Sequence, residues 1–199
     1  MLNFLNIKTL NGSAIGEHLN ALAQLRMSVF REWPYLYEGN MHYEAMYLQR
    51  YADCADSISM LCFDGDTLVA ASTALPLEHA ETEMQKPMIS AGYSADEFLY
   101  YGESLILRPY RGQGLGGHFF KLRENHGIHL GKKNGCFCAV ERHADDPRKP
   151  LNYRGNEAFW RRHHYRPTEI MCHFDWPDVG TDENSTKPLR FWIKELNQQ

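Results

Sequence analysis

The chain has 199 residues, of which 43% are hydrophobic and 23% charged, and its formal charge is −4. At about 150 residues per domain, this length predicts one large domain or two very small ones, and a domain of this size holds a core without disulfides or metal. The acidic balance argues against a general nucleic-acid-binding protein, and no apolar run approaches the ~18 residues of a membrane span. The 5 cysteines form no CxxC pair and the N-terminus lacks signal-peptide features, which favours reduced thiols in a cytoplasmic protein.

The first 56 residues predict one strand and two helices. A strand is expected over 4–10. Apolar residues recur at helical spacing over 13–30, with Ser13 as the expected N-cap. A connector over 33–40, rich in tyrosine, leads to a second helix over 43–51.

Strand signals dominate the middle of the chain. Two strands, over 57–63 and 67–75, flank Asp64-Gly65-Asp66, which is a strong hairpin signal. Residues 78–96 are polar and predict loop and short helix. A strand over 98–107 follows.

The last third predicts a glycine-rich turn and further helices and strands. The turn over 111–117 opens a helix with Leu115, Phe119, Leu122 and His126 on one face. The remaining elements are a strand over 136–141, a helix over 156–164, and strands over 169–174 and 189–193. This order predicts a mixed α/β domain, an α+β fold with a mixed sheet, and no linker divides residues 1–199.

The turn between the strand over 98–107 and the following helix carries the strongest motif. Its sequence is Arg111-Gly112-Gln113-Gly114-Leu115-Gly116-Gly117. Glycines there allow a tight backbone turn, and free N–H groups at a helix start favour a phosphate or pyrophosphate. Arg108 and Arg111 add positive charge. The alternative is a loop whose glycines serve only the turn.

Two pyrophosphate-binding families compete for this segment. Gly112, Gly114 and Gly117 satisfy G-x-G-x-x-G, and Glu141 lies near the ribose-binding position of a Rossmann domain, which would indicate a dinucleotide-dependent oxidoreductase. However, residues 108–111 separate the strand from the turn, and the chain after Gly117 is too short for the rest of a doubly wound sheet and a substrate domain. The Rossmann interpretation is therefore the weaker one.

The segment over 111–116 also matches R-x-x-G-x-G, and it follows a strand and Pro109-Tyr110. It resembles the acyl-CoA motif of the GNAT N-acetyltransferase superfamily. Residues 159–165, Phe-Trp-Arg-Arg-His-His-Tyr, look like that family's late helix-to-strand signature. The resemblance implies a GNAT-like single domain, a central mixed sheet with splayed fourth and fifth strands flanked by helices.

The resemblance also implies an acetyl-CoA site. The backbone of the fourth strand, here Leu105, Ile106 and Leu107, would bind the pantetheine arm. The turn would hold the pyrophosphate through the N–H groups of Arg111, Gly112, Gln113, Gly114, Leu115 and Gly116. The thioester would lie between the splayed strands, where a backbone amide polarises its carbonyl. The implied activity is direct transfer of an acetyl group to an amine.

The motif does not identify the catalytic acid and base, which are sought among the nearby ionisable residues. Transfer to an amine needs a neutral nucleophile and a proton for the departing thiolate. Glu103, on the same face of its strand as Leu105, is the candidate base, and its alternative role is a salt-bridged strand glutamate. Glu141, His143 and Asp145, after the next strand, are alternatives that would act through water.

The sequence departs from the family where a tyrosine usually serves as the acid. Trp160 occupies that position, and His164 replaces the signature's glycine. An indole N–H is no acid at neutral pH, so Tyr153 is the candidate acid, with packing as its alternative role. A thiolate with a pKa of about 8.5 is also a tolerable leaving group without an acid.

Two further features concern metals and the acceptor. Cys136 and Cys138 share a strand face but lack a second cluster, so no metal is predicted. By family analogy the acceptor enters beside the connector between the first two helices, which supplies Trp33, Tyr35, Tyr37, Glu38 and Tyr43. Aromatic walls with a carboxylate suit a small amine with an apolar body, although these residues could equally cap the core.

Three functions therefore stay open: an N-acetyltransferase acting on a small-molecule or peptide amine, a catalytically degenerate acyl-CoA-binding or sensing domain, and a dinucleotide-dependent oxidoreductase. None of them requires a nucleic-acid or membrane partner. The sequence does not fix the oligomeric state, and a homodimer is retained as one alternative.

Overall fold

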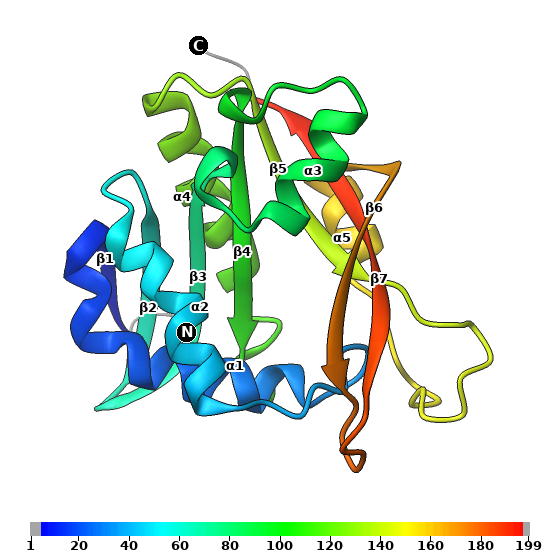
Figure 1. The fold of residues 1–199 in the computed structure, drawn as a ribbon. Helices are drawn as coiled ribbons and strands as arrows, with labels where there is room; N and C mark the ends of the chain where they lie inside the picture. The colour runs from blue at the N-terminus through cyan, green and yellow to red at the C-terminus, as the bar shows by residue number, and fades with distance from the viewer. Residues whose placement is uncertain (1–4, 197–199) are drawn as a thin grey trace.

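A computed structural model describes residues 5–196 and contains one mixed sheet of seven strands (Figure 1). The strands lie in the order β1-β2-β3-β4-β5-β7-β6, and β4 and β5 are the parallel neighbours among them. Their bounds are β1 Asn6–Asn11, β2 Ile58–Asp64, β3 Thr67–Pro76, β4 Phe98–Ile106, β5 Asn134–Val140, β6 Arg166–Pro177 and β7 Asn184–Glu195. The mixed α/β fold with a mixed sheet is thus confirmed.

Helices cover both faces of this sheet (Figure 1). One face carries α1 (Leu19–Phe30), α2 (Met41–Asp53) and α3 (Thr82–Ser90), whose apolar residues share one core cluster. The other face carries α4 (Leu115–His129) and α5 (Glu157–Arg162), which pack through Phe120 and Phe159. Short 3-10 helices cover Gly12–His18, Leu77–His79, Ala95–Glu97 and Arg108–Tyr110. No helix within residues 5–196 combines the length and apolar character of a membrane span.

The element boundaries differ from the predictions in three places. The expected helix over 13–30 begins as a 3-10 turn at Gly12, and Ser13 does not cap it; Asn11 precedes the turn without a side-chain cap. Residues 78–96 contain the full helix α3, which packs Met84 and Met88 into the core. The last two strands are longer than predicted because they form an extended hairpin. Phe4, where the first strand was expected to begin, lies outside the described residues.

The parallel pair β4–β5 separates soon after it begins. Its register covers only Phe98–Tyr100 of β4 against Asn134–Cys136 of β5. Beyond Tyr100, β4 continues beside β3 while β5 continues beside β7. The opening between the two strands therefore lies inside the sheet, and it exposes strand edges that a ligand could use.

A β-bulge in β4 lies at this opening. The β3–β4 register shifts between Ser72 and Ala74, so Gly102 and Glu103 together oppose Thr73. A bulge adds one residue and exchanges the faces of the strand beyond it. Tyr100 before the bulge and Leu105 after it accordingly share the core cluster under α1 and α2.

Candidate functional site

The glycine-rich turn forms an open cradle at the start of α4. Gly112 and Gly114 have φ values of +77° and +89°, which favour glycine strongly. A Cβ at either position would meet nothing within 4 Å. Within residues 5–196, the first intrahelical bonds come from the N–H groups of Gly117 and His118 to Gly114, so the amides of 112–116 have no backbone acceptor. The amide of Arg111, also predicted to bind the pyrophosphate, instead donates to the Arg108 carbonyl at 3.2 Å. This geometry fits a pyrophosphate.

The two arginines of the motif are bound to a carboxylate at the end of α1. Arg111 donates to Glu32 at 2.9 Å and Arg108 donates to it at 3.2 Å. Arg111 also donates to the carbonyl oxygen of Ile106 at 2.9 Å. Burial would raise the pKa of Glu32, but the hydrogen bonds from both arginines lower it. Glu32 therefore keeps two guanidinium groups beside the cradle.

The predicted pantetheine strand has one free edge. From Tyr101 to Ile106, β4 pairs with β3 on one side and has no strand on the side facing β5 within the described residues. The Leu105 side chain is buried, and the Leu107 amide donates to Val69 in β3. The backbone of this segment faces the opening, as the resemblance implies, although Leu107 supplies no free amide.

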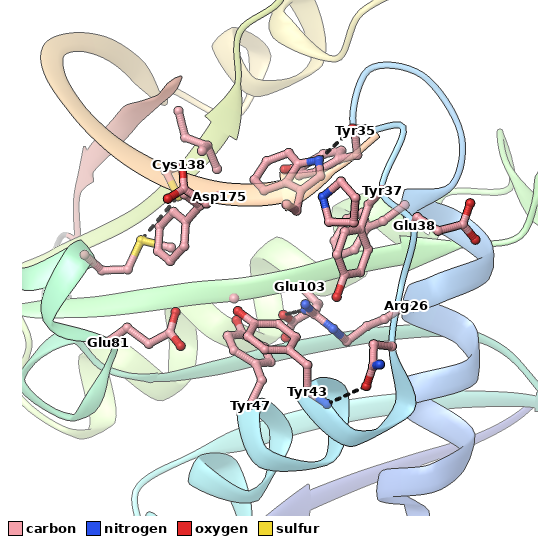
Figure 2. Close-up of a pocket in the computed structure, with 18 of the residues that line it drawn as sticks. Arg26, Tyr35, Tyr37, Glu38, Tyr43, Tyr47, Glu81, Glu103, Cys138 and Asp175 are labelled. Carbon is pink, nitrogen blue, oxygen red and sulfur yellow. Dashed lines mark hydrogen bonds and ion pairs between the residues drawn. The ribbon is translucent and has the colours of Figure 1, made fainter. Parts of the chain in front are cut away.

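A cavity of about 270 Å³ lies on the α1–α2 face at the β4–β5 opening (Figure 2). We call it the tyrosine cavity. Tyr100, Gly102 and Glu103 reach it from β4 and Cys138 reaches it from β5. Its other lining residues are Arg26, Phe30, Tyr35, Tyr37, Glu38, Asn40, Tyr43, Tyr47, Glu81, Met84, Phe174, Asp175, Trp176, Pro177, Asn184 and Leu189. Tyr35, Tyr37 and Glu38 thus line one cavity, as predicted for an acceptor site.

Glu103 lies in the wall of the tyrosine cavity, and each of its carboxylate oxygens accepts one hydrogen bond. One carboxylate oxygen accepts from Arg26 of α1 and the other accepts from the Thr73 hydroxyl of β3. Arg26 also donates to Glu44 of α2, which is fully buried. Burial would lower the pKa of Arg26, but the two carboxylates raise it. The sequence-predicted salt-bridged role of Glu103 is therefore realised, and its carboxylate still borders the cavity.

A second cavity, of about 310 Å³, is lined by the C-terminal end of β5 and the loop after it. Trp33 lines this cavity and not the tyrosine cavity, so the predicted acceptor set is divided between the two. Glu141 and His143 also line it, whereas Asp145 does not. Tyr35 lines both cavities.

Tyr153, the predicted acid, and Trp160, in the family's tyrosine position, line this second cavity, whereas His164 does not. Tyr153 packs edge-on against Trp33 with ring centroids 6.2 Å apart, and burial raises its pKa. Trp160 packs against Phe137 and Trp192. His164 has a φ of +68°, the conformation for which glycine is otherwise preferred. These positions support packing more directly than proton transfer.

A buried ionic cluster fixes the loops around both cavities. Asp178, after β6, accepts from Arg142 at 2.8 Å and from Arg148 at 2.6 Å, and lies 3.3 Å from Lys187. Arg142 also donates to the carbonyl oxygens of Pro34 and Tyr35. The connector after α1, the loop after β5 and the β6–β7 hairpin therefore meet at one carboxylate.

We expect Asp178→Asn to lower the free energy of unfolding by about 2 kcal/mol at pH 7. Burial would raise the pKa of Asp178, but hydrogen bonds from Arg142 and Arg148 lower it to about 2. A depressed pKa stabilises the fold above the unfolded value of about 3.9 and loses that effect as the pH falls toward 2. Urea unfolding should show the same difference in free energy of unfolding between the wild type and Asp178→Asn at pH 7 and pH 5. At pH 3 this difference should fall to about half. A difference independent of pH would contradict the assignment.

Sequence reasoning missed four charged residues of the tyrosine cavity and its wall, of which Asp175 of β6 is exposed. Arg26 and Glu44 occupy the apolar stripes of α1 and α2, and a charge in such a stripe is a signal of a buried partner. Glu81 precedes α3, in the segment expected to be polar loop, and nothing in the local sequence marks it. Cys136 and Cys138 do share a strand face, and both pack into the same core cluster.

Comparisons with known proteins define the class of the fold. No protein-family model and no curated protein matches the sequence. Among solved structures, a GNAT-family acetyltransferase from Streptococcus pneumoniae matches with a TM-score of 0.58 at 11% identity, over 97% of this chain and 99% of that one. Arabidopsis thaliana NAA60, in complex with a bisubstrate analogue, matches with a TM-score of 0.58 at 12% identity, over 96% of this chain and 100% of that one.

A third match carries a cofactor in its structure. YncA from Salmonella typhimurium, with its cofactor acetyl-CoA, has a TM-score of 0.54 at 10% identity, over 99% of this chain and 96% of that one. The chain therefore has the fold of the GNAT acetyltransferases. At these identities the likeness concerns the fold, and the activity is argued below from the site.

Proposed function

We propose that residues 1–199 form one acyltransferase domain that moves an acetyl group from acetyl-CoA directly to an amine. One observation carries this proposal: the tyrosine cavity reaches the β4–β5 opening, whose free strand edge leads to the cradle at Gly112–Gly116. Such an arrangement suits an acyl donor held along β4 and an acceptor held in the cavity. A small-molecule or peptide amine in the cytoplasm is the proposed partner.

The residues supply positioning and charge to this reaction. The amine nitrogen forms a bond to the thioester carbonyl carbon, the carbon–sulfur bond breaks, and the thiolate leaves. The amine loses one proton and the thiolate takes one. Glu103, at the cavity wall, accepts bonds from Arg26 and Thr73, so it would act on the amine proton through its remaining lone pairs or a water molecule. Burial raises the pKa of Tyr153, which makes it a poor proton donor and favours departure of the thiolate unaided.

A catalytically degenerate acyl-CoA-binding domain is the second candidate. It is favoured by Trp160 in place of the family's tyrosine and by the ion pair that engages Glu103. A dinucleotide oxidoreductase has no such support, because the glycine turn follows β4 of a largely antiparallel sheet and not a doubly wound parallel one.

Thermal shift and thiol release separate these functions. A ligand at 100 times its Kd stabilises the fold by about 2.7 kcal/mol, so acetyl-CoA should raise the melting temperature and NAD(P) should not. Stabilisation by NAD(P) alone would contradict both acyl-CoA functions. Thiol release from acetyl-CoA with an amine panel then separates the enzyme from the binding domain, which would bind acetyl-CoA and release no thiol.

We expect Glu103→Gln to lower kcat by about 100-fold, within the range of general base catalysis, with acetyl-CoA affinity unchanged. The carboxylate borders the acceptor cavity and lies away from the glycine cradle. The measurement is the pH–rate profile beside calorimetric binding of acetyl-CoA. An unchanged profile would remove Glu103 from the chemistry.

A further inference from the structure

The tyrosine cavity carries more negative than positive charge. Among its lining residues are four carboxylates and one guanidinium, that of Arg26. Arg26 is already bound by Glu103 and by Glu44 behind the wall, so this buried group of three has a net negative charge. Glu38 pairs with the exposed Arg31, and Asp175 accepts from Thr186. The interior therefore favours a positively charged guest.

Glu81 lines this interior with a carboxylate that keeps unused hydrogen-bonding capacity. Its Oε1 atom accepts from Arg50 at 2.8 Å, whereas Oε2 is buried and has no hydrogen-bond donor within the described residues. Burial raises the pKa of the Glu81 carboxyl, and the nearby Arg50 opposes that shift. Figure 2 shows the carboxylate directed into the cavity. A carboxylate oxygen that holds one donor keeps a lone pair for a second donor, here from a ligand in the cavity.

Aromatic rings form part of the wall of the same cavity. Tyr43 and Tyr47 of α2 and Trp176 of β6 line the same cavity. The faces of such rings attract ammonium groups and the methylene groups that an adjacent ammonium polarises. The guanidinium groups of Arg26 and Arg50 lie 4.2 and 5.0 Å from the Tyr47 ring centroid, and Lys187 Nζ lies 5.1 Å from that of Trp176. The protein thus uses two of these rings in this way itself, and within the described residues Tyr43 is the one of the three without a cation beside it.

The chemistry of acetyl transfer constrains which nitrogen Glu81 can hold. The attacking nitrogen must be neutral, so an ammonium kept charged by Glu81 cannot be the one that reacts. Glu103, at the β4–β5 opening, borders the position of the reacting nitrogen in the proposed function. An acceptor that satisfies both carboxylates therefore has two basic nitrogens joined by an apolar spacer.

We propose that the acceptor is a linear diamine or polyamine, and that Glu81 binds the ammonium that does not react. This inference rests on the proposed function only for the fate of the second nitrogen. Binding of the diamine is argued from the residues that line the cavity and does not depend on the transfer reaction. Glu81 is thus a specificity-determining residue, and Glu103 serves the reacting end.

The test compares 1,4-diaminobutane with 1-aminopentane, which has the same number of heavy atoms and one ammonium fewer. Calorimetry on the wild-type protein should show the diamine binding at least about 10-fold more tightly, as expected for one charge-assisted contact. Glu81→Gln should abolish that preference. Glu78→Gln is the matched control: Glu78 pairs with Lys132 through one oxygen, has a second buried oxygen without a donor, and does not line the cavity. It should retain the preference.

Equal affinities for both amines, or a preference that survives in Glu81→Gln, would overturn the inference. In turnover, Glu81→Gln should raise KM for the diamine about 10-fold and leave KM for the monoamine unchanged. An equal fall in kcat for both amines would instead make Glu81 a general base and also overturn the inference. If the diamine preference depends on Glu81 but no thiol is released from acetyl-CoA, the inference stands and the proposed transfer activity fails.

Discussion

Replacement of Gly114 by valine should abolish binding of acetyl-CoA while the protein stays folded. The residue has a φ of +89° immediately before α4, and its surroundings are open. A β-branched side chain resists this conformation, and its bulk would fill the cradle where, within the described residues, consecutive amides have no backbone acceptor. Strain in one exposed turn costs on the order of 1–3 kcal/mol, which a domain of this size tolerates. Calorimetric titration with acetyl-CoA, beside circular dichroism for the fold, measures both effects.

The chain offers a matched control for this variant in Gly92. Its φ is +90° and a Cβ there would also meet nothing within 4 Å, but it lies in the turn after α3. Gly92→Val should therefore show the same loss of stability and normal acetyl-CoA affinity. Normal affinity in Gly114→Val as well would place the pyrophosphate elsewhere.

Replacement of Arg26 by leucine should lower the free energy of unfolding by about 3–5 kcal/mol, the usual cost of breaking a buried ion pair. The guanidinium bonds Glu44 and Glu103, whose side chains are 0% and 1% exposed. Its removal leaves two buried carboxylates close together without the cation that they share. Urea unfolding followed by fluorescence of the four tryptophans measures the loss.

Arg31→Leu, at the C-cap of the same helix, provides the comparison. Arg31 pairs with Glu38, and both side chains are largely exposed. Exposed pairs contribute at most about 1 kcal/mol, so this variant should remain close to the wild type. A similar small change in Arg26→Leu would show that the buried pair contributes little to the fold.

Local sequence patterns predicted much of the fold. The spacing of apolar residues located α1 and α2, Asp64-Gly65-Asp66 located the β2–β3 hairpin, and the glycines located the start of α4. These signals depend on neighbours within a few residues, so they need no tertiary context. The short helix expected within residues 78–96 is present as α3, but its bounds could not be predicted, because only Met84 and Met88 of its residues are buried and so few apolar positions show no period.

The sequence predicted several residues that line the candidate site, but it did not predict the contacts among them. Tyr35, Tyr37 and Glu103 do line one cavity, since the connector after α1 and the strand β4 meet there. Trp33 faces the second cavity because Arg142 holds the connector through the carbonyls that follow Trp33. Contacts between residues over 100 positions apart, such as these, leave no local trace in a single sequence.

Because of the bulge in β4, the number of residues in this strand determines which of its side chains face the tyrosine cavity. Tyr100 and Glu103 both face the tyrosine cavity although an odd number of positions separates them, whereas a regular strand brings only even separations to one face. The extra residue is held by the Thr73 hydroxyl, which accepts from the Glu103 amide, and by Arg123, which donates to the Glu103 carbonyl. Side-chain replacements elsewhere in β4 do not change the number of residues between Tyr100 and Glu103. Loss or gain of one residue would exchange the two faces, and it would carry the carboxylate from the acceptor side to the layer of Tyr101 and Arg123 on the far side of the sheet.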